Sequence, residues 1–121
     1  MHGINETKKM TMFANYILDG RTPVEEPNLL RWGRWFENSS RRVKLKQIGV
    51  PKNRGKKAKK IHFVAVSTVF LGLDHGYGGK PLLFETMIFN GELDEEQYRC
   101  STWEEAEEMH EMACERVRLF G

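Results

Sequence analysis

An apolar run between residues 61 and 73 constrains the fold of this chain more than any other feature of its sequence. The run reads IHFVAVSTVFLGL and is apolar in both alternating registers. A strand that is apolar on both sides is typical of the middle of a sheet whose two faces are covered. We therefore expect a central strand here, with other strands pairing on each side of it.

Two segments that follow the run predict further strands. Residues 82–89 read as a strand, and Asn90-Gly91 directly after it favours a turn because these residues accept positive φ angles. Residues 97–100 are long enough for a short third strand of the same meander. Together these segments predict an antiparallel arrangement.

A hairpin is expected near the N-terminus. Residues 15–18 have β preference and lead into Asp19-Gly20, a turn signal for a two-residue hairpin. The alternative is a helix over 7–18, with apolar residues along one face. We favour the strand because three consecutive residues of β preference lie beside the turn.

Two helices are expected to pack on this sheet. In the C-terminal one, Thr102 and Glu105 have the spacing of a capping box. Its apolar residues recur at helical spacing, namely Trp103, Ala106, Met109, Ala113, Val117 and Phe120. A shorter helix over 29–37 has Leu29, Trp32, Gly33 and Phe36 on one face. Trp35 falls off that stripe, so we expect it to be partly exposed and to serve a subunit interface.

The pattern predicts one α+β domain over residues 12–121. We expect an antiparallel sheet of about four to five strands packed by two helices, the C-terminal helix being the longest. Residues 1–11 are polar and are expected to form a flexible N-terminus. Residues 49–60 contain proline, glycine and almost nothing apolar, and are expected to form a basic loop.

The charges are distributed unevenly although the formal net charge is only +2. Ten basic residues and no acidic residue lie between 41 and 60. They are Arg41, Arg42, Lys44, Lys46, Lys52, Arg54, Lys56, Lys57, Lys59 and Lys60. Ten carboxylates lie between 92 and 115 against the single Arg99. The basic segment is therefore a candidate for binding an anionic partner, unless it docks on the acidic helix of its own chain or of a second copy.

The start of this segment has an alternating pattern of its own. Val43 and Leu45 alternate with Lys44 and Lys46, which predicts a half-exposed strand with its cationic side in water. Lysine and arginine clusters neutralise phosphates without reading base sequence. Reading bases requires aromatic platforms, and residues 41–60 contain no aromatic side chain.

The sequence does not support a membrane-spanning, a secreted or a metal-binding protein. No apolar run reaches the roughly 18 residues of a membrane span, and the polar first residues lack the apolar core of a secretory signal. Cys100 and Cys114 have no metal-ligand spacing. We therefore expect a cytoplasmic protein with reduced cysteines, no cofactor and no metal.

Long motifs resemble a widespread group of small phage and prophage proteins that has no assigned biochemical function. They are YILDG at 16–20, WGRWFE at 32–37, VSTVFLGLDH at 66–75, PLLFETMIF at 81–89 and STWEEAE at 101–107. The resemblance covers about residues 15–118 and implies a viral origin and a cytoplasmic setting in the infected bacterium, without a mechanism. The lysine-rich stretch at 49–60 departs from the group and resembles an insertion.

A set of polar residues suits acid–base chemistry. Asp74, His75, Glu85, Glu107 and His110 are of the residue types used for proton transfer or for oxygen and nitrogen metal sites. A fallback catalytic set of His75, Glu85 and His110 follows. The ordinary explanation is that Glu85 accepts a hydroxyl hydrogen bond and that His110 lies on an exposed helix flank. None of the established catalytic or metal-binding motif spacings is present.

A glycine-rich loop is a candidate ligand site. Its residues are Asp74, His75, Tyr77, Gly78, Gly79 and Lys80. Bare backbone N–H groups with an added cation can cradle a phosphate, and Tyr77 can stack on a base. The same glycines also suit an ordinary connection between strands.

Three functional hypotheses result. The first is a non-enzymatic phage binding protein that interferes with a host process such as antiviral defence, either as an anti-CRISPR-like inhibitor or by sequestering a nucleotide signal. The second is a nucleic-acid-binding phage accessory protein that uses residues 41–60, and the third is a small hydrolase or nuclease. The expected partners are a host protein complex or a nucleic acid, with a nucleotide ligand and a second copy of the chain as further partners.

Overall fold

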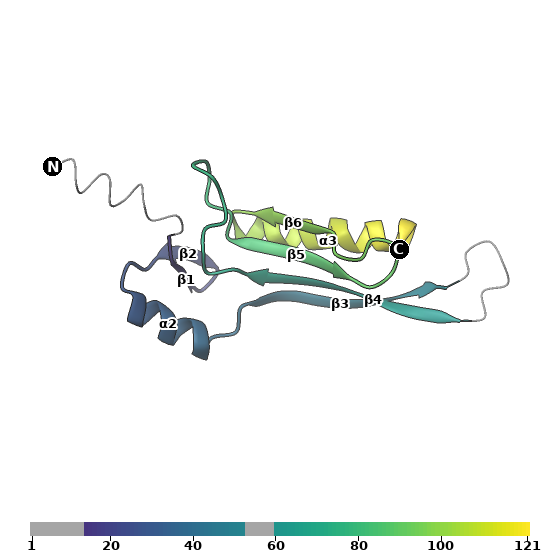
Figure 1. Cartoon of the computed structure of the whole chain (residues 1–121), viewed down its shortest axis with the longest axis horizontal. Helices are drawn as coiled ribbons and strands as arrows, with labels where there is room; N and C mark the ends of the chain where they lie inside the picture. The colour runs from purple at the N-terminus through teal and green to yellow at the C-terminus, as the bar shows by residue number, and fades with distance from the viewer. Residues whose placement is uncertain (1–13, 53–59) are drawn as a thin grey trace.

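The computed structural model describes residues 14–52 and 60–121 (Figure 1). In chain order the elements are β1 (Tyr16–Asp19), β2 (Thr22–Glu25), α2 (Leu29–Asn38), β3 (Arg42–Pro51), β4 (Ile61–Phe70), β5 (Phe84–Phe89), β6 (Gln97–Cys100) and α3 (Trp103–Phe120). The expected α+β class is confirmed, with a four-stranded antiparallel sheet, a separate hairpin and an 18-residue C-terminal helix as the longest helix. The predicted flexible segment at 1–11 lies outside the described residues.

The sheet is a meander in the order β3-β4-β5-β6, so β3 and β6 form its edges. Asn90 and Gly91 both have positive φ, 81° and 77°, as the turn signal required. A Cβ atom at Gly91 would lie 2.9 Å from Val64 Cγ2, which leaves no room for a side chain there. The connection continues to residue 96 before β6 begins, so it is longer than a two-residue turn.

The helix α3 packs along the sheet and contacts all four of its strands (Figure 1). Val64, Val66, Thr68 and Phe70 on β4 are fully buried on the side that faces α3. They form the core together with Ile88 and with Ala113, Cys114 and Val117 of the helix. Alternation along β4 thus places every second residue under α3.

The expectation that β4 is covered on both faces is wrong. Ile61 and Phe63, which alternate with the buried residues, are 66% and 63% exposed. Ala65 and Ser67 on the same side are only partly buried. Among the described residues α3 is the helix that covers the sheet, and it covers one side, so the second apolar register of β4 faces solvent.

Val43 at the start of β3 packs against the core as predicted, but beyond it the two sides of the strand are the reverse of the prediction. Lys44 and Lys46 pair directly across from Thr68 and Val66 and therefore lie on the side of α3. Leu45 pairs with Ser67 and lies on the uncovered side. A register shift between Arg42 and Lys44 determines which residues of β3 face α3. The sequence pattern alone does not reveal this shift.

Tryptophans join the N-terminal hairpin and α2 to one end of the sheet. The indole N–H of Trp32 donates to the carbonyl oxygens of Tyr16 (3.1 Å) and Gly72 (3.0 Å). Trp35 is half-buried and packs edge-on against Phe70, with ring centroids 5.7 Å apart. The predicted hairpin is confirmed over the helical alternative, whereas an interface role for Trp35 stays a prediction.

Replacement of Thr102 by alanine is expected to destabilise the protein. The Thr102 hydroxyl accepts the backbone N–H of Glu105, and the Glu105 carboxylate accepts the backbone N–H of Thr102, both at 3.1 Å. The loss of this capping box should lower the free energy of unfolding by about 1 kcal/mol, measured by urea titration. Thr102→Ser retains the hydroxyl and should keep most of the stability. Equal losses in both variants would show that the cap contributes little.

Candidate functional site

Some cations in the described part of the basic segment contact an acidic or aromatic side chain of the same chain, and others do not. Lys44 Nζ lies 3.2 Å from Glu111 Oε1 on α3. The Arg41 guanidinium lies over the Phe36 ring, 3.8 Å from its centroid, in a cation–π contact. Only Lys44 of the predicted set therefore docks on the acidic helix of its own chain, as far as the structure describes these residues.

The remaining described cations have no carboxylate partner. Within residues 14–52 and 60–121, Arg42, Lys46, Lys52 and Lys60 make no ion pair. All four are exposed, and the backbone N–H of Lys52 donates to Lys60 O (2.9 Å), so these two residues lie side by side. Unneutralised charge thus remains on the β3–β4 hairpin. The predicted residues Arg54, Lys56, Lys57 and Lys59 lie outside the described residues.

The uncovered side of the sheet is here called the open face. It consists of the residues that alternate with the buried ones: Leu45, Gln47, Gly49, Pro51, Ile61, Phe63, Ala65, Ser67, Val69, Glu85, Met87, Phe89, Gln97 and Arg99. Its one carboxylate, Glu85, accepts a hydrogen bond from Arg99 Nε at 2.9 Å. The open face therefore combines apolar and aromatic side chains with uncharged polar ones, and its single negative charge is neutralised.

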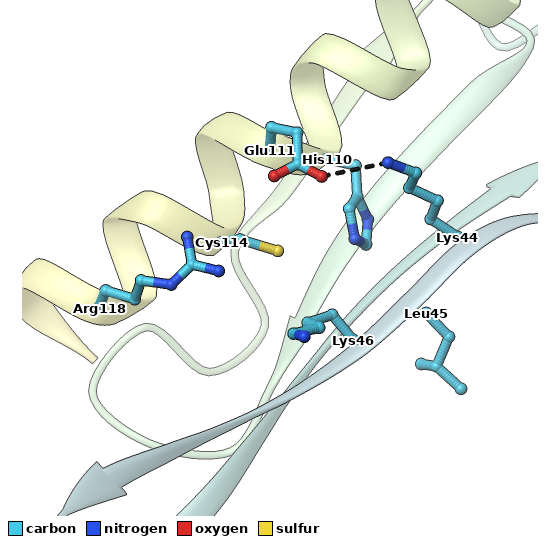
Figure 2. Close-up of a pocket in the computed structure, with 7 residues that line it drawn as sticks. All are labelled: Lys44, Leu45, Lys46, His110, Glu111, Cys114 and Arg118. Atoms are coloured by element: carbon cyan, nitrogen blue, oxygen red, sulfur yellow. Dashed lines mark hydrogen bonds and ion pairs between the residues drawn. The ribbon is translucent and has the colours of Figure 1, made fainter.

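A polar pocket of about 340 Å³ lies on the other side, between β3 and α3. Figure 2 shows His110 pointing from the helix toward β3, between Lys44 and Lys46, with Cys114 and Arg118 further along the helix. Two lysines beside an imidazole are suited to holding a small anion, although Glu111 supplies an opposing charge.

His110 is part of a buried hydrogen-bonded chain. Its Nδ1 lies 2.8 Å from the Thr68 hydroxyl, which in turn contacts the Thr86 hydroxyl at 2.5 Å. The side chain is 2% exposed, so the alternative of an exposed helix flank is wrong. Burial lowers the pKa of His110, the Glu111 carboxylate opposes this shift and the Lys44 ammonium reinforces it. The imidazole is therefore held in its neutral form.

The fallback catalytic residues do not come together. The His110 side chain lies between α3 and the sheet, whereas Glu85 lies on the open face. The sheet itself therefore separates them. His75 belongs to the connection between β4 and β5, where its backbone N–H donates to Leu82 O at 3.1 Å. The structure thus forms no single site from these three residues.

The glycine-rich loop is closed by one of its own predicted ligands. Asp74 Oδ1 accepts the backbone N–H groups of Gly76 (2.7 Å) and Leu82 (2.9 Å). Tyr77 at the tip is 96% exposed, and Gly78 has a φ of 80°. Lys80 and Gly79 are also exposed. Asp74 is therefore a structural anchor, and ligand binding by the loop stays a prediction.

The cysteines are free thiols. Burial raises the pKa of Cys100 to about 11, with the nearby Glu105 adding to the shift and a hydrogen bond to the backbone of Thr102 opposing it. Burial also raises the pKa of Cys114. Both thiols are thus held in their protonated form at neutral pH. No cluster of three or more histidine, cysteine or acidic side chains suited to a metal ion occurs in the described ranges.

Comparisons with known proteins gave no match, whether with family models, curated proteins or solved structures. No helix in the described parts of the chain has the length and apolar character that crossing a membrane requires.

Two residues of the open face were not selected from the sequence. Phe63 and Phe89 lie on neighbouring strands and are 63% and 46% exposed. Their position in an apolar register indicated core packing. The number of predicted helices could have indicated that they are exposed, because two helices at one side and one end cannot cover both faces of a four-stranded sheet.

The stability of the protein is expected to fall as the pH drops below about 6.5. The unfolded chain protonates this histidine near its usual pKa of about 6.5, whereas folded His110 takes up the proton only at lower pH. The unfolded state therefore binds more protons in this range, and the free energy of unfolding decreases as the pH falls. Urea titrations between pH 7.5 and 5.5 measure the slope.

The variant His110→Gln identifies the group responsible for the slope. It should flatten the dependence on pH in this range, whatever its effect on absolute stability. Glu96, Glu105 and Glu111 have pKa values that are lowered by hydrogen bonds, so their contribution is lost only at more acidic pH. An unchanged slope in His110→Gln would contradict the assignment.

Proposed function

We propose that this chain is a non-enzymatic, phage-encoded binding protein that attaches to nucleic acid through its β3–β4 hairpin and so interferes with a host process such as antiviral defence. The observation that carries the proposal is the set of exposed cations on the hairpin, Arg42, Lys52 and Lys60, which have no carboxylate partner among the described residues. Cations left unpaired in water bind phosphates by releasing counterions.

The charge distribution supports an anionic partner rather than self-docking. The carboxylates of α3 that form ion pairs do so with Arg21, Lys44 and Arg118. Lys52 and Lys60 lie at the far end of the hairpin, past the point where Lys44 meets the helix (Figure 1). The acidic helix and the free cations therefore occupy different parts of the molecule, an arrangement that steers anions toward the hairpin.

The phage setting rests on the motif resemblance and not on a site. A small protein of phage origin that covers nucleic acid would prevent a defence nuclease from binding its substrate or its guide. Binding alone suffices for this effect. The separation of Glu85 from His110 supports a role without catalysis at that set of residues.

Binding to an oligonucleotide is expected to depend on salt and on the hairpin cations. The double variant Lys52→Gln, Lys60→Gln should bind single-stranded DNA more weakly at low salt. Its plot of log K against log salt should be shallower by about 1.4, since each lost phosphate contact on a single strand removes about 0.7. Fluorescence anisotropy at salt concentrations between about 50 and 200 mM measures both the affinity and the slope.

The matched control removes two equally exposed arginines from α2. Arg31→Gln, Arg34→Gln changes the net charge by the same amount at a distance from the hairpin. It should keep the slope of the wild-type chain. Equal losses in the two variants would indicate non-specific attraction to net charge, and an absence of binding at low salt would overturn the proposal.

Interference with defence is tested separately in cells. A bacterium that carries an active defence system and expresses this chain should give more plaques with a targeted phage than the same bacterium expressing the Lys52→Gln, Lys60→Gln variant. Equal plaque numbers for the wild-type chain and an empty vector, across nuclease-based defence systems, would contradict this role while leaving nucleic-acid binding unaffected.

A further inference from the structure

The buried imidazole of His110 has one ring nitrogen left for a ligand. Its Nδ1 lies 2.8 Å from the Thr68 hydroxyl, whereas its Nε2 has no hydrogen-bond partner among the described residues. The side chain is 2% exposed and yet lines the pocket of about 340 Å³ between β3 and α3. A ring nitrogen in such a place is costly to leave without a polar partner, so the pocket is where a partner for Nε2 would bind.

Two threonines determine which ring nitrogen carries the proton. Thr86 is fully buried, and within the described residues its hydroxyl contacts only the Thr68 hydroxyl, at 2.5 Å. Thr86 therefore donates to Thr68, because a buried hydroxyl hydrogen without an acceptor is costly. Thr68 in turn donates its single hydrogen to Nδ1 of His110. A neutral imidazole that accepts at Nδ1 carries its proton on Nε2, so His110 presents an N–H donor to the pocket.

The other charged groups of the pocket are mainly cationic. Lys44, Lys46 and Arg118 line it, against the single carboxylate of Glu111. The imidazole of His110 extends from α3 toward β3 between the two lysines (Figure 2). Lys46 makes no ion pair with any described residue, so its ammonium group is available to a ligand. The pocket thus combines N–H donors with an excess of positive charge.

Two of these cations already meet carboxylates of α3. Lys44 Nζ lies 3.2 Å from Glu111 Oε1, and Arg118 Nη1 lies 3.3 Å from Glu115 Oε2. The two glutamate side chains are 61% and 62% exposed, and ion pairs of this kind contribute little to stability. Glu111 therefore competes only weakly with an external anion for the ammonium group of Lys44.

We propose that this pocket binds a terminal phosphate group, whose oxygens accept hydrogen bonds from His110 Nε2 and from the ammonium groups of Lys44 and Lys46. A terminal phosphate has a charge of about −1.5 to −2 and three strong acceptor oxygens, one for each of these donors. The inference is independent of the proposed function, because it uses neither Lys52 nor Lys60.

The same geometry argues against a metal ion in this pocket. A nitrogen that carries a proton does not ligate a metal, and burial holds the neighbouring Cys114 thiol in its protonated form by raising its pKa. No cluster of three histidine, cysteine or acidic side chains suited to a metal occurs in the described parts of the chain. An oxyanion is therefore the occupant that the donors of the pocket fit.

Long-range proton–nitrogen correlation NMR of the histidine rings tests the proposal in phosphate-free buffer. The free protein should show a neutral His110 ring with its proton on Nε2, and the variant His110→Gln assigns the signal. Inorganic phosphate and adenosine 5′-monophosphate should each shift the Nε2 signal until it saturates, whereas adenosine should not. A proton on Nδ1, or an Nε2 signal that no phosphate compound shifts, would overturn the proposal.

Two exposed side chains of the pocket change the dissociation constant in opposite directions. Lys46→Gln should weaken phosphate binding by about fivefold to tenfold, as for a charge-assisted hydrogen bond at a partly exposed site. Glu111→Gln should strengthen it, because Lys44 then loses its competing carboxylate. Arg34→Gln on α2 and Glu25→Gln on β2 make the same charge changes outside the pocket and should leave the constant unchanged.

The remaining outcomes separate the site from general attraction to charge and identify the source of the phosphate. Equal tightening in Glu111→Gln and Glu25→Gln, or acetate binding as tightly as phosphate, would overturn the assignment. Tighter binding of adenosine 5′-monophosphate than of inorganic phosphate would support a free nucleotide as the source. Tighter binding of an oligothymidine with a 5′-phosphate than of the same strand without it would support the end of a strand.

Discussion

Burial of one side of β4 beneath α3 is the interaction on which the rest of the structure depends. Val64, Val66, Thr68 and Phe70 are fully buried there, and the helix contributes Ala113 and Val117 to the same core. A single long helix covers one side of a four-stranded sheet and no more. The residues on the other side are then available to bind a partner. The exposed apolar side chains on that side require an explanation.

A buried polar chain lies within that core. Thr86, Thr68 and His110 form consecutive hydrogen bonds across two strands and the helix. Such groups are costly to bury unless they are paired, so the three residues specify how α3 is placed against the sheet. Burial lowers the pKa of His110 and keeps it neutral, and the sheet separates it from the Glu85 carboxylate, which explains why two residues suited to acid–base chemistry do not cooperate.

The sequence predicted the features whose causes are local. The Thr102 cap and the Asp19-Gly20 turn depend on residues within a few positions of one another. The covered side of β4 depends on how many helices reach the sheet, and a run that is apolar in both registers carries no information on that point. The prediction of a doubly covered strand failed for this reason.

The same limit applies to the candidate site. The count of basic residues between 41 and 60 identified the hairpin, but the pairing of Lys44 with Glu111 spans 67 positions of sequence and depends on the register shift in β3. Phe63 and Phe89 become neighbours only through the pairing of β4 with β5. Their spacing along the chain gives no sign of this contact.

The location of β3 at the margin of the sheet has one more consequence. Within residues 14–52 and 60–121, no strand lies beside the ten residues of backbone on its outer side, which are a template for pairing with another polypeptide. Lys44 and Lys46 lie on the α3 side of this strand, so an incoming strand would place its own residues beside two positive charges. Positive charges on an edge strand disfavour pairing with the edge of another chain, an effect that does not depend on any ligand.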